Sequence, residues 1–323
     1  MILNIFYILL GFFLLVKGGD YLIDGAVSIA KRAKLSSMVI GLTVIGFGTS
    51  APELIVSAQA SLAGSSGIAI GNVVGSNIAN IALILGVTAL IHPIPAQKST
   101  IKIEMPFMVI AMMLFIGAAI FGTGTIERWQ GIAFMLIIIS FVTWQIINSR
   151  KNAQSAEEVE EGVQMPIWKA LLFVVGSIAV MIWGADRLIE GASGIAMDLG
   201  TQFGVDPKTL ERIIGLTIVA IGTSLPELFA SVIAARKGET DMAIGNIIGS
   251  VTFNILCVIG ASSAICPIVN SAEGFVTDYC IMLFLGVILW LFLRTKHLLE
   301  RWEGVVLLII YVLFIAKTIV LSA

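Results

Sequence analysis

The sequence predicts an all-α integral membrane protein in which ten transmembrane helices form two inverted repeats of five helices each. Hydrophobic residues make up 58% of the 323 residues and charged residues only 12%, and the mean hydropathy is +1.02. A soluble domain averages roughly 45–50% apolar and about 25% charged residues, so this composition suits a lipid environment. The apolar residues are gathered in long segments, and two sets of motifs recur at one constant spacing.

Ten apolar segments are long enough to cross a bilayer, which requires about 20 mostly apolar residues. Their approximate ranges are 2–30, 36–62, 67–91, 105–121, 127–148, 167–197, 210–235, 241–265, 276–293 and 302–320. The first segment continues through Lys17 and has no positive region before it, so we interpret it as a retained helix rather than a signal peptide.

The long polar stretch from Asn148 to Gln164 marks the boundary between the two halves. We therefore predict a first repeat over residues 1–148, an acidic cytoplasmic linker over 149–166 and a second repeat over 167–323. The glutamates of this stretch are typical of a solvated linker, and a calcium-sensing role is the alternative.

Lysine and arginine in the loops predict the orientation, because they accumulate on the cytoplasmic side. One side holds Lys31, Arg32, Lys34, Lys98, Lys102, Arg150, Lys151, Arg236, Lys237, Arg294, Lys296 and Arg301. The other side holds Arg128, Lys208, Arg212 and Lys317. Both termini are therefore expected outside the cytoplasm, in a multi-pass protein of the cell (inner) membrane of a bacterium or archaeon.

The chain contains a duplicated unit. GLTVIGFGTSAPEL at 41–54 and GLTIVAIGTSLPEL at 215–228 share nine of fourteen residues at an offset of 174. The same offset carries AIGNVVGSNIANI at 69–81 onto AIGNIIGSVTFNI at 243–255, with eight of thirteen residues identical. An odd number of spans in each unit makes the second unit insert upside down, an arrangement common in secondary transporters.

Glu53 and Glu227 lie well inside apolar segments at equivalent repeat positions. A carboxylate at the bilayer centre is costly, so such residues usually mark ion pathways. The structural alternative is a protonated glutamate that is hydrogen-bonded inside the helix bundle. A pair at equivalent positions favours the functional interpretation.

The neighbours of each glutamate also carry oxygen. Thr49, Ser50, Glu53 and Ser57 are repeated as Thr223, Ser224, Glu227 and Ser231, and most of each set shares a helix face. Pro52 and Pro226 remove a backbone donor, which predicts local unwinding near Gly48 and Gly222. Backbone carbonyls released in this way are tolerated at membrane depth where they line a polar cavity.

A second row of polar residues follows in the third and eighth spans. Asn72, Ser76 and Asn80 are spaced four residues apart, and Asn246, Ser250 and Asn254 repeat them. The pairs Gly71/Gly75 and Gly245/Gly249 are small-residue motifs that allow close helix approach. We therefore expect these spans to pack against the second and seventh spans.

The candidate ligands are all oxygen atoms, which selects hard ions such as calcium, magnesium, sodium or protons. The three cysteines have no metal spacing, and with two histidines in the chain a histidine-based catalytic site is not expected. The glycines near GFGTSAPE do not follow a strand, which argues against a dinucleotide loop. A net charge of −2 gives no sign of a nucleic-acid partner.

These motifs resemble those of a known family. GTSAPE and GTSLPE, each followed by GNxxGS, are similar to the two alpha repeats of the calcium/cation antiporter superfamily, sodium/calcium exchanger branch, and the resemblance covers nearly the whole chain. It implies a mid-membrane metal site with Glu53 and Glu227 as the main calcium ligands. The remaining implied site residues are Thr49, Thr223, Ser50, Ser224, Ser76, Ser250, Asn80, Asn254, Gly46 and Ala220. It also implies a monomer in which the first and sixth spans slide across the bundle.

One position departs from the family pattern. Several exchangers have aspartate where this chain has Asn254, whereas here both repeats carry asparagine (Asn80 and Asn254). This argues against potassium dependence and leaves sodium and protons open as the driving ion.

We therefore expect a non-enzymatic antiporter that needs no cofactor and exports calcium in exchange for sodium by alternating access. Its expected partners are small inorganic cations and the lipid bilayer. The alternatives are a proton-coupled antiporter for calcium or another divalent cation, a passive cation channel with the glutamates at a constriction, and an intramembrane enzyme, which the absence of an activated nucleophile disfavours.

Overall fold

In a computed structural model, the protein is built almost entirely of helices. The structure describes residues 2–121, 124–155, 165–202, 222–269 and 272–322. The helices of the first half are α1 (Ile2–Ala33), α2 (Ser37–Ile40), α3 (Gly46–Thr49), α4 (Ala51–Leu62), α5 (Ser66–Ile78), α6 (Leu85–Ile91), α7 (Met105–Ile120) and α8 (Arg128–Ser155). Those of the second half are α9 (Ile167–Gln202), α12 (Leu225–Arg236), α13 (Thr240–Phe253), α14 (Gly260–Ile265), α15 (Ala272–Lys296) and α16 (Arg301–Ser322).

Short π-helical turns continue several of these helices. They are η1 (Gly41–Ile45), η2 (Ala79–Ile84), η3 (Thr100–Glu104) and η5 (Asn254–Ile259). The repeat offset carries η2 onto η5 to within one residue, so both copies of the GNxxGS segment run into a π-turn. Such turns widen the helix locally and occur frequently at functional sites.

Seven helical segments of the described chain are long and apolar enough to cross a membrane. They are Ile2–Ala33, Ser66–Ile91, Thr100–Ile120, Arg128–Lys151, Ile167–Gly200, Thr240–Ile265 and Phe275–Lys296. An eighth span is formed by the pair Ser37–Thr49 and Ala51–Leu62, which is bent by 46°. Of the two other expected spans, 302–320 lies in α16, and 210–235 is described only from residue 222 onward. The count of ten therefore stays a prediction.

The bend in the second span lies where the sequence predicts local unwinding. Ser50 joins α3 to α4 with φ −83° and ψ 5°, and Pro52 is the second residue of α4. Proline is accepted in the first turn of a helix because the N–H groups there have no intrahelical partner. Ser224 has nearly the same backbone angles, φ −92° and ψ 7°, and it precedes Pro226 in α12 in the same way.

The fourth span begins earlier than the sequence predicts. Helical structure is present from η3 onward. Lys102 therefore belongs to a helix, whereas the predicted span of 105–121 leaves it in a loop. A single lysine within one turn of a span end can extend its ammonium group toward water while its methylenes stay on the apolar surface. The hydropathy pattern counts the charge as a boundary, which explains the difference.

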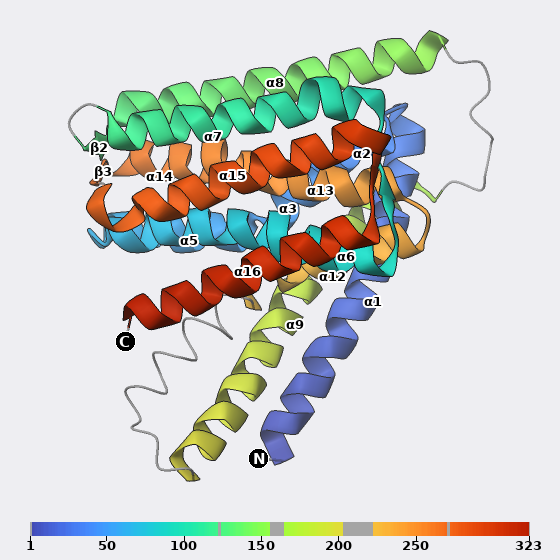
Figure 1. Ribbon diagram of the computed structural model, residues 1–323. Coiled ribbons are helices and arrows are strands. Elements are labelled where there is room, and N and C mark those ends of the chain that lie inside the picture. Colours follow the sequence, from blue (N-terminus) through green and yellow to red (C-terminus); the bar gives the residue numbers. More distant parts are fainter. Residues whose placement is uncertain (1, 122–123, 156–164, 203–221, 270–271, 323) are drawn as a thin grey trace.

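Helix α13 lies at the centre of the bundle, and all residues from Met242 to Phe253 are buried. It contacts α2, η1 and α3 of the first half, as well as α12. In Figure 1, α7, α8 and α15 run roughly parallel above it, whereas α1 and α9 lie side by side at a different inclination and project from the bundle. The long helices thus enclose the segments that carry the polar motifs.

Glycines on both helices form the seam between α1 and α9. A Cβ atom at Gly25 would lie 2.9 Å from the carbonyl oxygen of Ala170, and one at Gly184 would lie 3.2 Å from that of Gly11. Small residues therefore let the two backbones touch, as in other membrane helix pairs. The offset of 166 that relates Gly25 to Gly191 differs from that of the central motifs. At Gly191 the same close contact occurs, with Ile8 N 3.0 Å away.

Two short antiparallel strand pairs lie at opposite ends of α7. β1 (Ile94–Pro95) pairs with β4 (Leu298–Leu299), and β2 (Thr125–Ile126) pairs with β3 (Ile268–Val269). The repeat offset carries β1 onto β3 and β2 onto β4 within one residue. Each pair therefore joins one strand from each half, and exchanging the halves converts one pair into the other.

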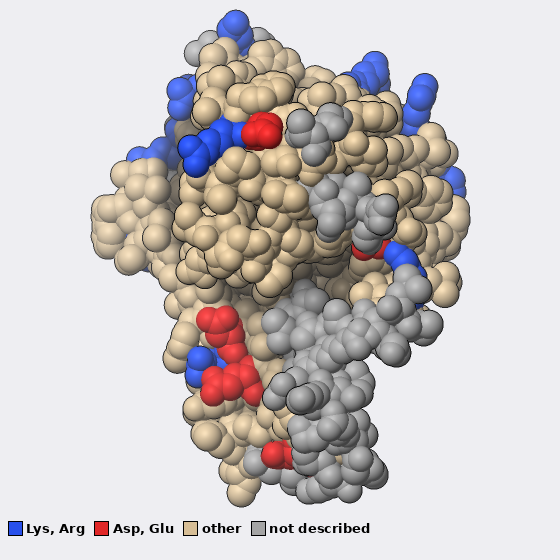
Figure 2. Space-filling model, turned by 90° about the vertical axis from the view of Figure 1, so that its left-hand side faces the viewer, with Lys and Arg blue, Asp and Glu red and all other residues tan. Residues whose placement is uncertain are grey.

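Large apolar side chains are exposed over much of the molecule, including Phe12, Trp129, Trp168 and Trp302. Most of the surface visible in Figure 2, outside the grey atoms, consists of uncharged residues. A soluble monomer rarely exposes apolar surface on this scale. Contact with lipid accounts for it.

Candidate cation site

Glu53 and Glu227 occupy equivalent positions in the first turns of α4 and α12. Only 1% of Glu53 and none of Glu227 is exposed. The N-terminal end of a helix carries partial positive charge and unpaired N–H groups, which stabilise a nearby carboxylate. Two buried carboxylates require compensating positive charge, which a bound cation would supply.

Asparagines of the neighbouring helices hold the backbone at both glutamates. Asn72 Nδ2 donates to Ser57 Oγ at 2.9 Å and to the Glu53 carbonyl at 3.3 Å. Asn246 Nδ2 makes the same two contacts with Ser231 Oγ and the Glu227 carbonyl, at the same two distances. The repeat is thus preserved in hydrogen-bond geometry as well as in sequence.

Polar contacts across the repeat boundary join the two motifs. Thr49 Oγ1 lies 3.3 Å from Asn246 Oδ1 and 3.4 Å from Ser250 Oγ. The Ser250 hydroxyl also donates to the carbonyl of Gly46, at 3.3 Å. These contacts bring three of the predicted site residues of the two halves to one place.

Several buried polar atoms of the predicted site residues have no hydrogen-bond partner among the described residues. They are Ser50 Oγ, Ser224 Oγ, Glu53 Oε2, both carboxylate oxygens of Glu227, both amide atoms of Asn80, and Asn254 Oδ1. Buried polar atoms are nearly always hydrogen-bonded, so a group of unpaired ones requires an explanation. Most of them are oxygens, which are the ligands that hard cations take.

No cluster of three or more His, Cys, Asp or Glu residues suited to a metal ion occurs in the described ranges. The site has two acidic residues, and its other candidate ligands are hydroxyl, amide and carbonyl oxygens. Such a ligand set suits an ion that is bound and released, since fewer charged ligands hold a cation less tightly.

The chain matches the family described as sodium/calcium exchanger protein over residues 3–147 and 169–320. It belongs to this family. It is 37% identical over 320 residues to CaxA of Alkalimonas amylolytica, with 97% of each chain covered. It is 35% identical over 348 residues to the sodium/calcium exchanger MaX1 of Methanosarcina acetivorans, again with 97% of each chain covered.

The fold is also similar to a solved structure, that of the sodium-calcium exchanger NCX_Mj soaked with zero Na⁺ and Ca²⁺. The TM-score is 0.80 and the sequence identity 31%, and 98% of both chains is covered. The protein is accordingly a multi-pass membrane antiporter that transports small cations, in a family of exchangers and not of enzymes.

All but one of the predicted site residues of this exchanger lie in the described ranges. Ala220 falls outside them. Ser76 Oγ lies 3.5 Å from Glu53 Oε1, and Ser76 and Thr223 line one cavity of about 320 Å³ between α5, α15 and α16. Asn80 and Asn254 lie in the π-turns η2 and η5, where neither amide group is fully paired.

Two kinds of contact in this exchanger were not predicted from its sequence. Asn77 Oδ1 accepts a hydrogen bond from Asn254 Nδ2 at 3.1 Å, which leaves Oδ1 of Asn254 as its unpaired atom. Asn72 and Asn246 support the site through the backbone. Their four-residue spacing from the serines was visible in the sequence, but nothing in it distinguishes a supporting amide from a ligand.

Proposed function

We propose that this exchanger exports calcium from the cytoplasm in exchange for sodium, and that Glu53 and Glu227 bind both ions in turn. The observation that carries the proposal is the pair of buried carboxylates with unpaired oxygens at equivalent repeat positions. Two carboxylates neutralise one calcium ion, and the same oxygens suit sodium. Occupancy of one site by either ion, but not both, is a sufficient basis for antiport. The name of the relative MaX1 supports this pair of ions.

The proposed architecture is ten helices in two inverted repeats, residues 1–148 and 167–323, joined by the linker 149–166. This architecture is supported by the two strand pairs, because exchanging the two halves of the chain converts one pair into the other. We assign both termini to the outside and the linker to the cytoplasm. In the proposed transport cycle, α1 and α9 move as one unit because their glycine seam holds them together, and the site opens to each side alternately.

Proton coupling is the second candidate. Both π-turns carry an asparagine, so the site offers two carboxylates for the driving ion. A carboxylate can bind a proton instead of sodium, and calcium would displace it. The site residues and the fold are the same in both cases.

The coupling ion is tested by uptake of radioactive calcium into proteoliposomes that hold the purified exchanger. An outward sodium gradient and an outward proton gradient are imposed separately. Uptake with the sodium gradient alone supports sodium coupling, and uptake with the proton gradient alone assigns proton coupling. If neither gradient drives calcium uptake, calcium is not the substrate.

The site assignment is tested in the same assay with Glu53→Gln and Glu227→Gln. Each change removes a ligand charge but keeps the side-chain shape, so uptake is expected to fall by at least about 100-fold. Glu190→Gln, at an exposed carboxylate, is the matched control and should transport normally. Uptake at the normal rate by either site variant, with normal membrane insertion, contradicts the assignment.

A further inference from the structure

Comparison of the two repeats draws attention to a further buried carboxylate, Glu104, for which no ion pair with a cationic side chain is found among the described residues. The offset of 174 carries Glu104 onto Asp278. Asp278 Oδ1 lies 2.6 Å from Lys317 Nζ of α16. Glu104 Oε1 instead accepts a hydrogen bond from Gln145 Nε2 of α8, the helix that corresponds to α16, at 2.7 Å. With the offset of 174, Gln145 corresponds to position 319, and Lys317 lies two residues before that position. The second repeat therefore supplies a positive charge where the first repeat supplies a neutral amide.

The surroundings of Glu104 leave it incompletely paired. Only 3% of its surface is exposed, and its Oε2 has no hydrogen-bond partner among the described residues. A buried carboxylate without a compensating charge is strongly destabilising, so a cation or a proton must neutralise it. In the second repeat an ammonium group does this for Asp278.

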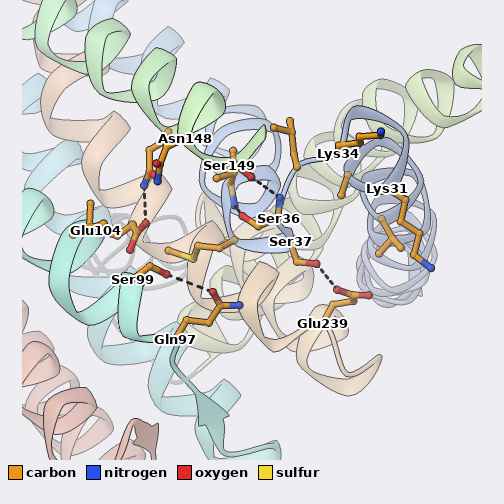
Figure 3. A pocket seen from close by; sticks show the side chains of 17 residues that line it. Lys31, Lys34, Ser36, Ser37, Gln97, Ser99, Glu104, Asn148, Ser149 and Glu239 are labelled. Atoms are coloured by element: carbon orange, nitrogen blue, oxygen red, sulfur yellow. Dashed lines mark hydrogen bonds between the residues drawn. The ribbon is translucent and has the colours of Figure 1, made fainter. Parts of the chain in front are cut away.

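Glu104 lines a cavity of about 340 Å³ at the ends of α1, α2 and α8 and the start of α13. Figure 3 shows its carboxylate on one wall, near the side chains of Ser99 and Gln97, with Glu239 on another wall. Ser37 Oγ donates to Glu239 Oε2 at 2.9 Å, and Ser99 Oγ to Gln97 Oε1 at 3.4 Å. The cavity is large enough for a cation that keeps part of its water shell.

The charges around the cavity favour a cation over an anion. Lys31 and Lys34 also belong to its lining, but both are exposed. In Figure 3 their ammonium groups lie on the side away from Glu104 and point outward. The wall around Glu104 presents carboxylate, amide and hydroxyl oxygens.

We propose that this cavity is a second cation site, separate from Glu53 and Glu227, in which Glu104 is the main ligand. It would take a hard cation, sodium or calcium, because the groups around it offer oxygen ligands. The walls come from α2, which leads into the bent span with Glu53, and from η3 and α8. An ion bound here ties these segments together without entering the site between the repeats.

The test measures binding of radioactive calcium and sodium by equilibrium dialysis of the purified chain with Glu53→Gln and Glu227→Gln combined. This parent lacks the carboxylates of the proposed transport site, so an ion that it still binds is bound elsewhere. The transport proposal is tested separately, by the uptake assay. The parent is expected to keep a component of binding for at least one of the two ions. Adding Glu104→Gln should weaken that component by at least about tenfold, or 1.4 kcal/mol.

Gln145→Lys provides a second variant that keeps Glu104. The new ammonium group imitates Lys317, occupies the place of the cation, and should abolish the same component. Glu303→Gln is the matched control: Glu303 is buried and its Oε2 accepts from Glu300 N, and Gln130 makes the equivalent contact with Glu127 N in the first repeat. The control should bind like the parent. No binding of either ion by the parent, or undiminished binding after Glu104→Gln, overturns the proposal.

Discussion

At the scale of single residues, each half of the proposed cation site contains a supporting asparagine that is not itself a proposed ligand. Asn72 and Asn246 bond to the serine one turn beyond the glutamate and to the glutamate's own carbonyl. They fix the direction in which α4 and α12 leave the bend, and hence the place of each carboxylate. Geometry of this kind is what an ion-binding site requires of its supporting residues.

The two asparagines differ in one respect, which leads to a prediction. Asn246 is buried and also lies 3.3 Å from Thr49 Oγ1 across the repeat boundary, whereas Asn72 is half-buried. Asn246→Ala therefore leaves more buried polar groups unpaired than Asn72→Ala, at about 1–3 kcal/mol for each group. We expect the melting temperature in detergent and the calcium uptake to fall more for Asn246→Ala.

Ser231→Ala serves as the control for that comparison, because it removes one partner of Asn246 and leaves the bond to the Glu227 carbonyl. Its effect should be smaller than that of Asn246→Ala. Equal melting temperatures for Asn72→Ala and Asn246→Ala would show that the contact with Thr49 contributes no stability.

At the scale of helices, the sequence predicts the broken span because proline and glycine act locally. Pro52 lies at the bend in the structure, and Gly245 and Gly249 lie where the sequence predicts a close helix contact. Their neighbours are Met38 and Leu42 of the second span, as predicted for the eighth span. At Gly71 the described neighbour is Phe275 of α15, and no described atom lies within 4 Å of a Cβ at Gly75, so the predicted contact of the third span with the seventh stays a prediction.

The π-turns and the contact between Asn77 and Asn254 could not be predicted in this way. A π-turn inserts one residue without a composition signal, and Asn77 has valine at the equivalent position, Val251. The repeat comparison therefore marks Asn77 as a difference but gives it no partner. The partner depends on how the two halves pack, which no local pattern encodes.

The contact of α13 with the second span leads to the next prediction. A Cβ atom at Gly249 would lie within 2.8 Å of the backbone carbonyl carbon and Cα of Leu42, neither of which can rotate away. Gly249→Ala should thus lower stability by about 1–3 kcal/mol. It should also reduce calcium uptake, because Ser250 is the next residue and contacts Gly46 and Thr49.

Gly117→Ala is the matched control, a helical glycine in α7 with no described atom within 4 Å of the added carbon. It should be neutral or slightly stabilising, since alanine favours helix more than glycine. Thermal unfolding in detergent measures both variants. A Gly249→Ala protein as stable as Gly117→Ala would show that the helices separate at little cost.

At the scale of the whole molecule, several contacts between the two halves occur twice, with the roles of the halves reversed. β1 pairs with β4 at one end of α7 and β2 with β3 at the other, and Gly86 packs on Gly304 as Gly260 packs on Gly131. An axis that relates these contacts would exchange the two ends of the bundle and so reverse the direction across the membrane, as the proposed inverted repeat requires. The same relation makes the departures from symmetry informative, as for Glu104 and Asp278.

The proposed inverted arrangement leads to a prediction about which side of the membrane each end of α7 faces. Lys98 and Arg128 are both exposed and lie next to β1 and β2, at opposite ends of α7. Because lysine and arginine are in excess on the side of Lys98, we propose that this side faces the cytoplasm. With the three native cysteines replaced by alanine, Arg128→Cys should react with a membrane-impermeant maleimide added to intact cells. Lys98→Cys should react only after the membrane is permeabilised. The opposite labelling pattern would reverse the orientation, and labelling of both positions from outside would contradict a single pass of α7 across the membrane.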